Sequence, residues 1–322
     1  MLNRSTLVPA ILLAVTLAAV PASAQTQLAR AFVSSFGNDA NDCSRAAPCR
    51  TFQRAHDQTL QIGEITVLDP GGYGAVTITK SISIINDGVG EAGALVSGGF
   101  NGITINAGAD DRVSLRGLTV KGIGFGGGNG IVFTAGRFLS IENCTIRKFT
   151  GTAQSQFIGH GIIFNPAGDS DLAISNTLVS DNEGHGISVV RANNGVSHTT
   201  QATFSFVQVY HSGLHGIVLS AGGTAGSINA AADNVVSSFN AFSGLAIEGS
   251  NIILLNVTRS MVSSNGTGFS SSNDSGTIAV GQSNVARNNI TWSGRIFSYG
   301  DNYVAFNFDG GPPAPLGTVV KK

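Results

Sequence analysis

Apolar and polar residues alternate in short runs, and one run recurs along the chain. Each copy begins with a small or polar residue, continues with glycine and then places apolar residues at every second position. The glycines follow one another at intervals of 24 to 31 residues. Alternation with a period of two is typical of a β-strand with one buried face, and a repeat of this length indicates a solenoid. The copies are Asn101–Ile105, Asn129–Phe133, His160–Phe164, His185–Val189, His215–Leu219 and Ser243–Ile247, with weaker copies at Thr267–Phe269 and Ser293–Ile296.

A second alternating run stands between copies of the first, as in 139–146, 172–179 and 255–262. It predicts further short strands joined by a corner, since asparagine and glycine, which favour turns, separate the apolar stretches. Two or three such strands cannot bury an apolar face alone. Stacked copies can, if each strand pairs in parallel with its equivalent one coil away. The sequence therefore predicts an all-β fold, a single-stranded parallel β-helix.

The N-terminus has the features of a secretory signal peptide. Arg4 precedes an apolar run over 7–20, which is too short to span a bilayer, and residues 22–24 are the small residues of a cleavage site. We expect cleavage after Ala24 and a secreted or periplasmic protein without a transmembrane anchor.

Charged residues make up only 11% of the chain. Without Arg4 the 18 basic residues fall to 17, against 19 acidic ones. Nothing in this near-balance indicates a nucleic-acid partner, which would need a basic stripe, and we expect none. The surface must consist largely of serine, threonine, asparagine and glycine, which suits a stacked solenoid and neutral or polyhydroxylated ligands.

The residues before the first repeat predict a cap. Residues 29–36 indicate a first strand, and residues 50–61 a short helix that covers the open end, where unpaired backbone groups would otherwise pair with other chains. Cys43 and Cys49 lie in the loop between them, close enough to bridge, and an exported protein permits the bond. Cys144 falls on an inward position, where we expect a small buried apolar residue.

Six stretches, spread from one end of the chain to the other, match a known pattern: Phe32–Asp39, Cys43, Pro48–Phe52, Leu68–Gly74, Thr77–Ile82 and Phe297–Asn302. They resemble secreted β-helix repeat proteins of the pectin-lyase-like superfamily, in a branch that is functionally uncharacterised. The resemblance implies a right-handed solenoid with an N-terminal helical and disulfide cap, but no activity, because fold does not determine function. We expect a signal peptide over 1–24, the cap over 25–61, the right-handed parallel β-helix over 62–309 and a tail over 310–322.

Three histidines, His160, His185 and His215, hold the same turn position on consecutive copies, so their Cβ atoms should stack about 4.8 Å apart. They are candidate ligand-binding residues, for a shallow anion or metal site or a pH-responsive edge. The structural alternative is that histidine is simply tolerated before an obligatory glycine, as asparagine is at Asn101 and Asn129 on earlier copies. We expect no metal, because zinc takes three or four ligands about 2 Å away and equivalent ladder positions do not converge.

The best carboxylate-imidazole cluster is Asp181 and Glu183 just before His185, and these are weak candidates for catalytic residues. Polygalacturonase-like enzymes carry several sequence motifs on neighbouring coils. Their Gly-His-Gly motif is present here at 159–161 and 184–186, but their other motifs are incomplete. Leu178 stands where an acid should follow Asn176 and Thr177. Inverting hydrolysis needs two carboxyl groups about 6.5–9.5 Å apart, and the matching copies lack that pair.

The outward positions of the glycine-led strands carry no acid, whereas a calcium-dependent lyase needs several carboxylates on adjacent coils. These positions are Thr104, Val132, Ile163, Ser188, Val218, Ala246 and Ser270. The apolar members form a row. Either another molecule covers this row, or it is covered by the loops over 122–128, 150–158 and 192–201. A column of asparagines closes many copies and is expected to exchange amide hydrogen bonds: Asn182, Asn240, Asn265, Asn288 and Asn307.

Three classes of function remain open. The sequence favours a secreted module that binds polysaccharide or another surface component, without a recognisable catalytic site or a cofactor. The second class is a polysaccharide-processing enzyme, either a pectin-lyase-like lyase or a glycoside hydrolase. The third is a structural protein that oligomerises through the apolar row.

Overall fold

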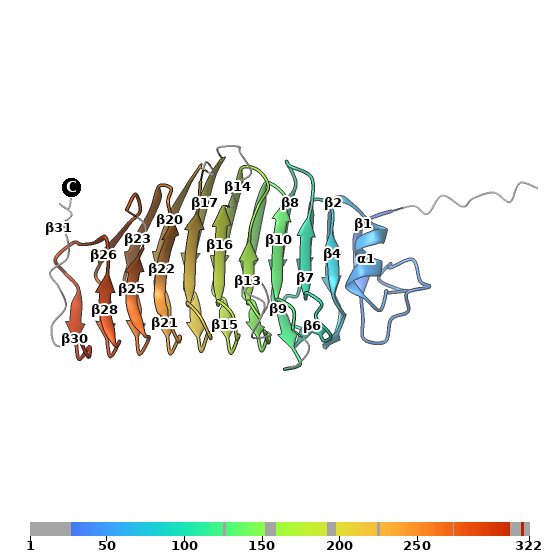
Figure 1. Ribbon diagram of the computed structural model, residues 1–322. Helices are drawn as coiled ribbons and strands as arrows, with labels where there is room; N and C mark the ends of the chain where they lie inside the picture. The colour runs from blue at the N-terminus through green and yellow to red at the C-terminus, as the bar shows by residue number, and fades with distance from the viewer. Residues whose placement is uncertain are drawn as a thin grey trace, which may run out of the picture.

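The computed structural model describes residues 27–124, 127–151, 159–191, 198–223, 226–272, 274–309 and 317–318. Their coils stack side by side along one axis, with helix α1 (Phe52–Gln58) at the N-terminal end (Figure 1). The predicted signal peptide and nearly all of the predicted tail lie outside these residues. No helix in the described part of the chain is long and apolar enough to cross a membrane.

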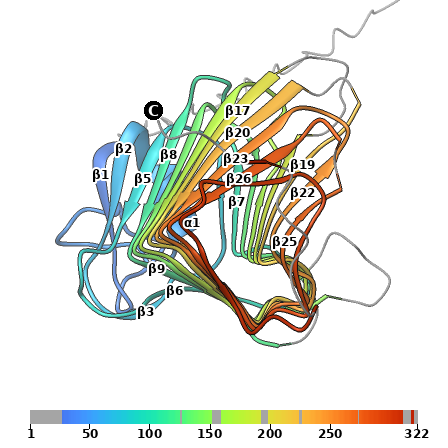
Figure 2. The ribbon, with the colours of Figure 1, turned by 90° about the vertical axis from the view of Figure 1, so that its left-hand side faces the viewer.

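Three parallel sheets surround the interior when the solenoid is viewed along its axis (Figure 2). Sheet A contains β1 (Leu28–Val33), β2 (Thr59–Val67), β5 (Ile82–Ile85), β8 (Arg112–Arg116), β11 (Phe138–Glu142), β14 (Ser170–Ser175), β17 (His198–Ser205), β20 (Gly226–Asp233), β23 (Ile253–Thr258), β26 (Thr277–Gly281), β29 (Ile296–Ser298) and β31 (Gly317–Thr318).

The chain passes from sheet A to sheet B and then to sheet C in each coil. Sheet B contains β3 (Gly71–Gly72), β6 (Ala92–Val96), β9 (Leu118–Gly122), β12 (Thr145–Arg147), β15 (Leu178–Ser180), β18 (Gln208–Tyr210), β21 (Val236–Ser238), β24 (Met261–Ser263), β27 (Asn284–Ala286) and β30 (Tyr303–Ala305). Sheet C contains β4 (Val76–Ile78), β7 (Ile103–Asn106), β10 (Ile131–Ala135), β13 (Ile162–Phe164), β16 (Ile187–Arg191), β19 (Ile217–Ala221), β22 (Ser243–Gly249), β25 (Thr267–Ser271) and β28 (Ile290–Ser293).

The predicted stacking is confirmed by the register. Ile162 pairs with Ile187, and Ile187 with Ile217, so these three side chains form one buried file inside sheet C. The glycine-led run is the sheet C strand, and the second run divides at a corner into a sheet A strand and a sheet B strand. Each coil therefore has three strands, and the fold is the right-handed parallel β-helix that the sequence predicts.

The glycine that precedes each sheet C strand is required by close packing. A Cβ on Gly161 would lie 2.6 Å from the Gly186 carbonyl oxygen and 2.9 Å from the Asn182 side-chain amide. A Cβ on Gly244 would lie 2.8 Å from the Asn265 amide. No residue larger than glycine fits at this position. The glycines therefore pack directly against the asparagine column.

The asparagine column forms the predicted ladder over the C-terminal coils. The Asn240 side-chain amide donates to Asn265 Oδ1 at 2.9 Å, Asn265 to Asn288 at 3.1 Å, and Asn288 to Asn307 at 3.1 Å. Backbone N–H groups of Asn240, Asn265 and Asn288 donate to the same oxygens. These amides satisfy buried backbone donors that the turn leaves without a partner.

One left-handed residue makes each corner between sheets A and B. The backbone φ lies between 45° and 54° at Asn143, Asn176, Phe206, Asn234, Arg259 and Gln282. A second left-handed corner follows sheet B, and His211 and Phe239 are among its residues, with φ of 51° and 59°. The two corners border the outer face of sheet B, one before each strand and one after it.

The N-terminal cap has the predicted parts, but its helix is shorter than expected. Thr51 caps α1 by accepting a hydrogen bond from the Arg54 N–H, and the helix ends at Gln58 rather than at 61. The expected last turn of the helix instead lies in β2, because Thr59 pairs with Leu28 and continues the sheet. Cys43 and Cys49 form the disulfide in the preceding loop.

The apolar row on sheet C is covered at two of its positions, as expected for a row that other parts of the chain cover rather than for an open surface. Val218 and Ala246 are fully buried, and Val132 and Ile163 are half-buried. The row is therefore not a free apolar surface, and oligomerisation through it is not supported. The loops that the sequence offers as a cover fall partly outside the described residues, which lack 125–126, 152–158 and 192–197.

Candidate functional site

The histidine column lies where the chain enters sheet C. The ring centroids of His160 and His185 are 5.0 Å apart, and those of His185 and His215 are 5.3 Å apart, with the planes inclined by 17° and 8°. The predicted stacking of these side chains is confirmed.

Each histidine ring accepts a hydrogen bond from the backbone of the next coil. The His185 N–H donates to His160 Nδ1 at 2.9 Å, the His215 N–H to His185 Nδ1 at 3.2 Å, and the Ser243 N–H to His215 Nδ1 at 3.0 Å. On the preceding coil, Asn129 Oδ1 accepts a hydrogen bond from the His160 N–H at 3.0 Å. The column is a ladder of side-chain acceptors that joins successive coils.

This bonding requires neutral rings, because a proton on Nδ1 would remove the acceptor. Burial, followed by the neighbouring His160 and His215 rings, lowers the pKa of His185 to about 3. His215 Nε2 lies 3.1 Å from a Glu248 carboxylate oxygen. The hydrogen bond from His215 lowers the pKa of Glu248, although burial acts in the opposite direction. The column is therefore a coil-to-coil brace that works in the uncharged state.

The carboxylates near His185 are engaged with other groups. Asp181 Oδ1 lies 3.3 Å from His211 Nδ1, and Glu183 accepts a hydrogen bond from the Gly151 N–H at 2.8 Å. Because His185 Nδ1 accepts from the next coil, the three side chains do not form one hydrogen-bonded acid-base cluster. A catalytic role for Asp181, Glu183 and His185 stays a prediction.

A metal site is not evident around these residues. Across the described ranges, no group of three or more His, Cys, Asp or Glu side chains is placed to hold a metal ion. The buried Cys144 thiol is also a poor ligand and nucleophile, because burial raises its pKa to about 11.

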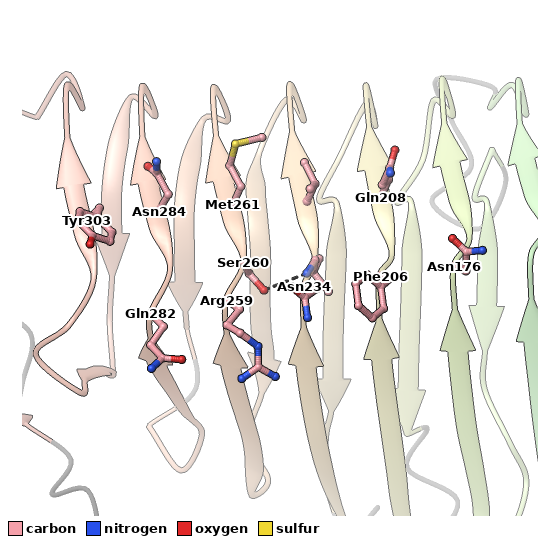
Figure 3. A pocket seen from close by; sticks show the side chains of 12 residues that line it. Asn176, Phe206, Gln208, Asn234, Arg259, Ser260, Met261, Gln282, Asn284 and Tyr303 are labelled. Carbon is pink, nitrogen blue, oxygen red and sulfur yellow. Dashed lines mark hydrogen bonds between the residues drawn. The ribbon is translucent and has the colours of Figure 1, made fainter.

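A groove of about 490 Å³ crosses the outer face of sheet B towards the C-terminal end (Figure 3). Two parallel files of side chains line most of it. The strand file occupies the first outward position of successive strands: Gln208, Val236, Met261, Asn284 and Tyr303. The corner file begins one coil earlier and occupies the left-handed corners before β15, β18, β21, β24 and β27: Asn176, Phe206, Asn234, Arg259 and Gln282.

The polar lining of the groove consists mainly of side-chain amides, on Asn176, Gln208, Asn234, Gln282 and Asn284. Each amide can donate and accept hydrogen bonds. Those of Gln282 and Asn284 make no hydrogen bond to any other described residue, so they are available to a ligand. Arg259 is the only charged residue in the described lining, and its Nη2 lies 2.5 Å from an Asp233 carboxylate oxygen.

The apolar lining places open aromatic rings near both ends of the groove. The exposed fraction is 60% for Phe206 and 75% for Tyr303, and neither ring stacks on another described side chain. Val236 and Met261 lie between them in the strand file. The groove therefore offers both apolar surfaces and hydrogen-bonding groups. A sugar ring presents the same two kinds of surface, so the two are complementary.

A hollow of about 600 Å³ over the N-terminal coils of sheet A is less suited to a ligand. Its aromatic residue, Phe138, already has the Arg112 guanidinium 5.8 Å from its ring centroid. The rest of the lining consists of four serines, three aliphatic residues (Ile62, Ile82 and Val113) and Asp110 as a further charge. The described lining of this hollow contains no side-chain amide, whereas that of the groove on sheet B contains five.

The groove on sheet B was not predicted from the sequence. The outward positions predicted there were those of the glycine-led strands, which belong to sheet C, and not those of the second run. The signal was present in that run, where amides and large apolar residues occupy many of the equivalent positions on consecutive copies. Recognising it requires the exact position of the corner that divides the run into two strands.

Comparisons with known proteins support the fold. No family model and no curated protein matches the chain. Among solved structures, pectate lyase Pel9A matches with a TM-score of 0.66 and 16% identity, over 89% of this chain and 79% of that one.

Two further structures match less well. The GH136 lacto-N-biosidase from Eubacterium ramulus gives a TM-score of 0.48 and 11% identity, over 90% of this chain and 68% of that one. The A-module of the Azotobacter vinelandii mannuronan C-5 epimerase AlgE4 gives 0.46 and 13%, over 81% and 91%. At these identities the likeness extends to the fold and no further: the chain is a right-handed parallel β-helix, the fold that it shares with pectate lyase Pel9A.

Proposed function

We propose that this protein is a polysaccharide-binding module that holds a glycan in the groove on the outer face of sheet B. The observation that carries the proposal is the lining of that groove, in which side-chain amides lie on several coils and an open aromatic ring lies near each end, Phe206 and Tyr303. Binding sites for small ligands commonly combine apolar walls with a few placed polar groups. Sugars need both, because hydroxyl groups surround a largely apolar ring.

Binding without catalysis is supported by the same lining. No carboxylate is among the described residues that line the groove, whereas glycoside hydrolysis commonly needs a pair of them. The neighbouring Asp233 carboxylate is already paired with Arg259 and hydrogen-bonded by Thr258. The groove is therefore better suited to hold a glycan than to cleave one.

A glycan array probed with the mature protein tests this proposal. We expect binding to at least one polysaccharide, and weaker binding by a Phe206→Ala, Tyr303→Ala double variant. The double variant Phe239→Ala, Phe308→Ala is the matched control, because those rings are exposed to similar extents, 57% and 75%, outside the groove. An array without any signal, or equal losses in both double variants, would contradict the proposal.

An assay for products separates binding from catalysis. The array polysaccharides that bind are incubated with the protein, and the solution is monitored for new reducing ends and for unsaturated uronates. We expect neither. Sustained release of either product would show an enzyme of the hydrolase or lyase class instead.

We also propose that the protein is exported and cleaved after Ala24. The support is the charged, apolar and small-residue order of residues 4–24. N-terminal sequencing of the full-length chain, expressed in a bacterium with a secretion pathway, should give Gln25 as the first residue. An uncleaved chain in the cytoplasm would contradict the proposal.

A further inference from the structure

The groove repeats its lining once per coil, and this repetition constrains the ligand. The strand file places one side chain on each of the strands β18, β21, β24, β27 and β30, in unbroken parallel register. Parallel strands are spaced by about 4.8 Å, so the five positions span about 19 Å along the solenoid axis. A ligand that used all of them would have to be long, extended and itself repetitive.

The sugar residue of an extended glycan advances by nearly the same distance as one coil. We propose, on the basis of the proposed function, that the ligand is a neutral, extended polysaccharide lying parallel to the solenoid axis with one sugar residue on each of five coils. On the first four of these coils the sugar also meets a side chain of the corner file, and on the fifth it meets Tyr303 alone, while Asn176 lies one coil before the five.

The charge of the groove favours a neutral chain. Its only charged residue within the described lining, Arg259, is neutralised by the Asp233 carboxylate 2.5 Å away. An anionic glycan would have to compete with that carboxylate, and a cationic one would meet no free acid. The amides of Gln282 and Asn284 donate to and accept from hydroxyl groups without any charge.

The open rings mark the two ends of the track. Phe206 precedes β18, the first of the five strands, and Tyr303 lies on β30, the last. Stacking on an aromatic ring buries the apolar face of a sugar with little loss of side-chain freedom. The end residues of the bound segment should therefore contribute strongly to affinity.

Titration calorimetry with oligosaccharides of defined length tests this inference. The probes are cello-, xylo- and manno-oligosaccharides of two to eight residues, with oligogalacturonates of the same lengths as the charged counterpart. For at least one neutral series we expect Kd to fall by about tenfold or more between two and five residues, and to change by less than about twofold beyond five. The charged series should bind more weakly at every length.

Variants test the register. Tyr303→Ala should move the plateau in affinity from five residues to four, whereas Phe308→Ala, equally exposed at 75%, should leave it at five. Tighter binding of the charged series, a Kd that does not change with length, or one that keeps falling to eight residues would overturn the inference. The proposed function would survive any of these results, since it is contradicted only if no glycan binds to the groove or if bound glycan is cleaved.

Discussion

At the scale of single residues, the corner before sheet B shows a conflict between backbone conformation and side chain. Its left-handed conformation costs an ordinary L-residue roughly 1–2 kcal/mol, whereas asparagine adopts it readily. Three of the six non-glycine residues at this corner are asparagine, and the exceptions are Phe206, Arg259 and Gln282. All three exceptions line the groove. Bulky residues in strained conformations are commonly found at functional sites.

Replacing Phe206 by asparagine should therefore separate stability from binding. We expect Phe206→Asn to raise the free energy of unfolding by about 0.5–1 kcal/mol, because asparagine tolerates the left-handed backbone. The affinity for the glycan should fall, because an open ring is lost. Denaturant titration measures the first effect, and calorimetry with the bound oligosaccharide the second.

Phe239→Asn is the control for this experiment. Phe239 has a similar φ, 59° against 54°, and a similar exposed fraction, 57% against 60%, but it lies at the corner after sheet B. It should give the same stabilisation with unchanged affinity. Equal loss of binding in both variants would show that the groove is not the binding site.

At the scale of elements, ladders of side chains hold the coils in register, and one ladder has a gap. Ser212 occupies the asparagine position between Asn182 and Asn240, and its side chain is too short to continue the amide bonds. The Asn182 side-chain nitrogen and the Ser212 hydroxyl are both buried without a hydrogen-bond partner. Buried polar groups without partners are costly.

Completing the ladder should stabilise the protein. Ser212→Asn is expected to increase the free energy of unfolding by about 1–2 kcal/mol, because its amide can accept from Asn182 and donate to Asn240. There is room for the larger residue, since Gly186 faces position 212 as Gly161 faces Asn182. The gain is read from urea titration. Ser212→Ala serves as the control, and equal stability of the two variants would contradict this account.

The histidine ladder should make stability depend on pH. The pKa of His185 is about 3 in the folded chain and 6.5 in the unfolded reference. As the pH falls below 6.5, the unfolded chain binds a proton that the folded chain does not, so stability declines down to about pH 3. At pH 4 the free energy of unfolding should be lower than at pH 7 by roughly 3 kcal/mol from this group.

The replacement His185→Asn isolates this effect. Asparagine holds the same position at Asn129 and accepts the same hydrogen bond, so the ladder is kept while the titrating group is removed. Urea titrations at pH 7 and pH 4 should show a smaller loss in the variant than in the unaltered protein. The lowered pKa of Glu248 acts in the same direction, so some loss should remain. An identical pH dependence in both proteins would contradict the assignment.

At the scale of the whole molecule, the fold could be predicted from the sequence because its determinants repeat. A glycine followed by a buried apolar residue, isoleucine on most copies, recurs along sheet C from Gly102 to Gly268, and each coil needs only its neighbours to bury its apolar side. The helix end was less predictable, since pairing of Thr59 with Leu28 overrides the local helical pattern. Local sequence carries no signal for such a long-range pairing.

The candidate site could be predicted only in part, for a physical reason. The histidine column follows directly from sequence position, but its hydrogen bonds to the next coil depend on how ring and backbone meet across the ladder. The groove depends on two further facts, the corner that divides the second run and the side on which Gln208 and Tyr303 project. A shift of one residue at that corner would turn both side chains inward.

Hydroxyl-radical footprinting, with and without a bound neutral oligosaccharide of five residues, tests the central claim that the glycan lies on sheet B. The oxidation of Phe206, Met261 and Tyr303 should fall several-fold on binding, while that of Phe239 and Phe308 should stay unchanged. Unchanged oxidation of the three groove residues, with protection of side chains on sheet A or sheet C, would contradict the account.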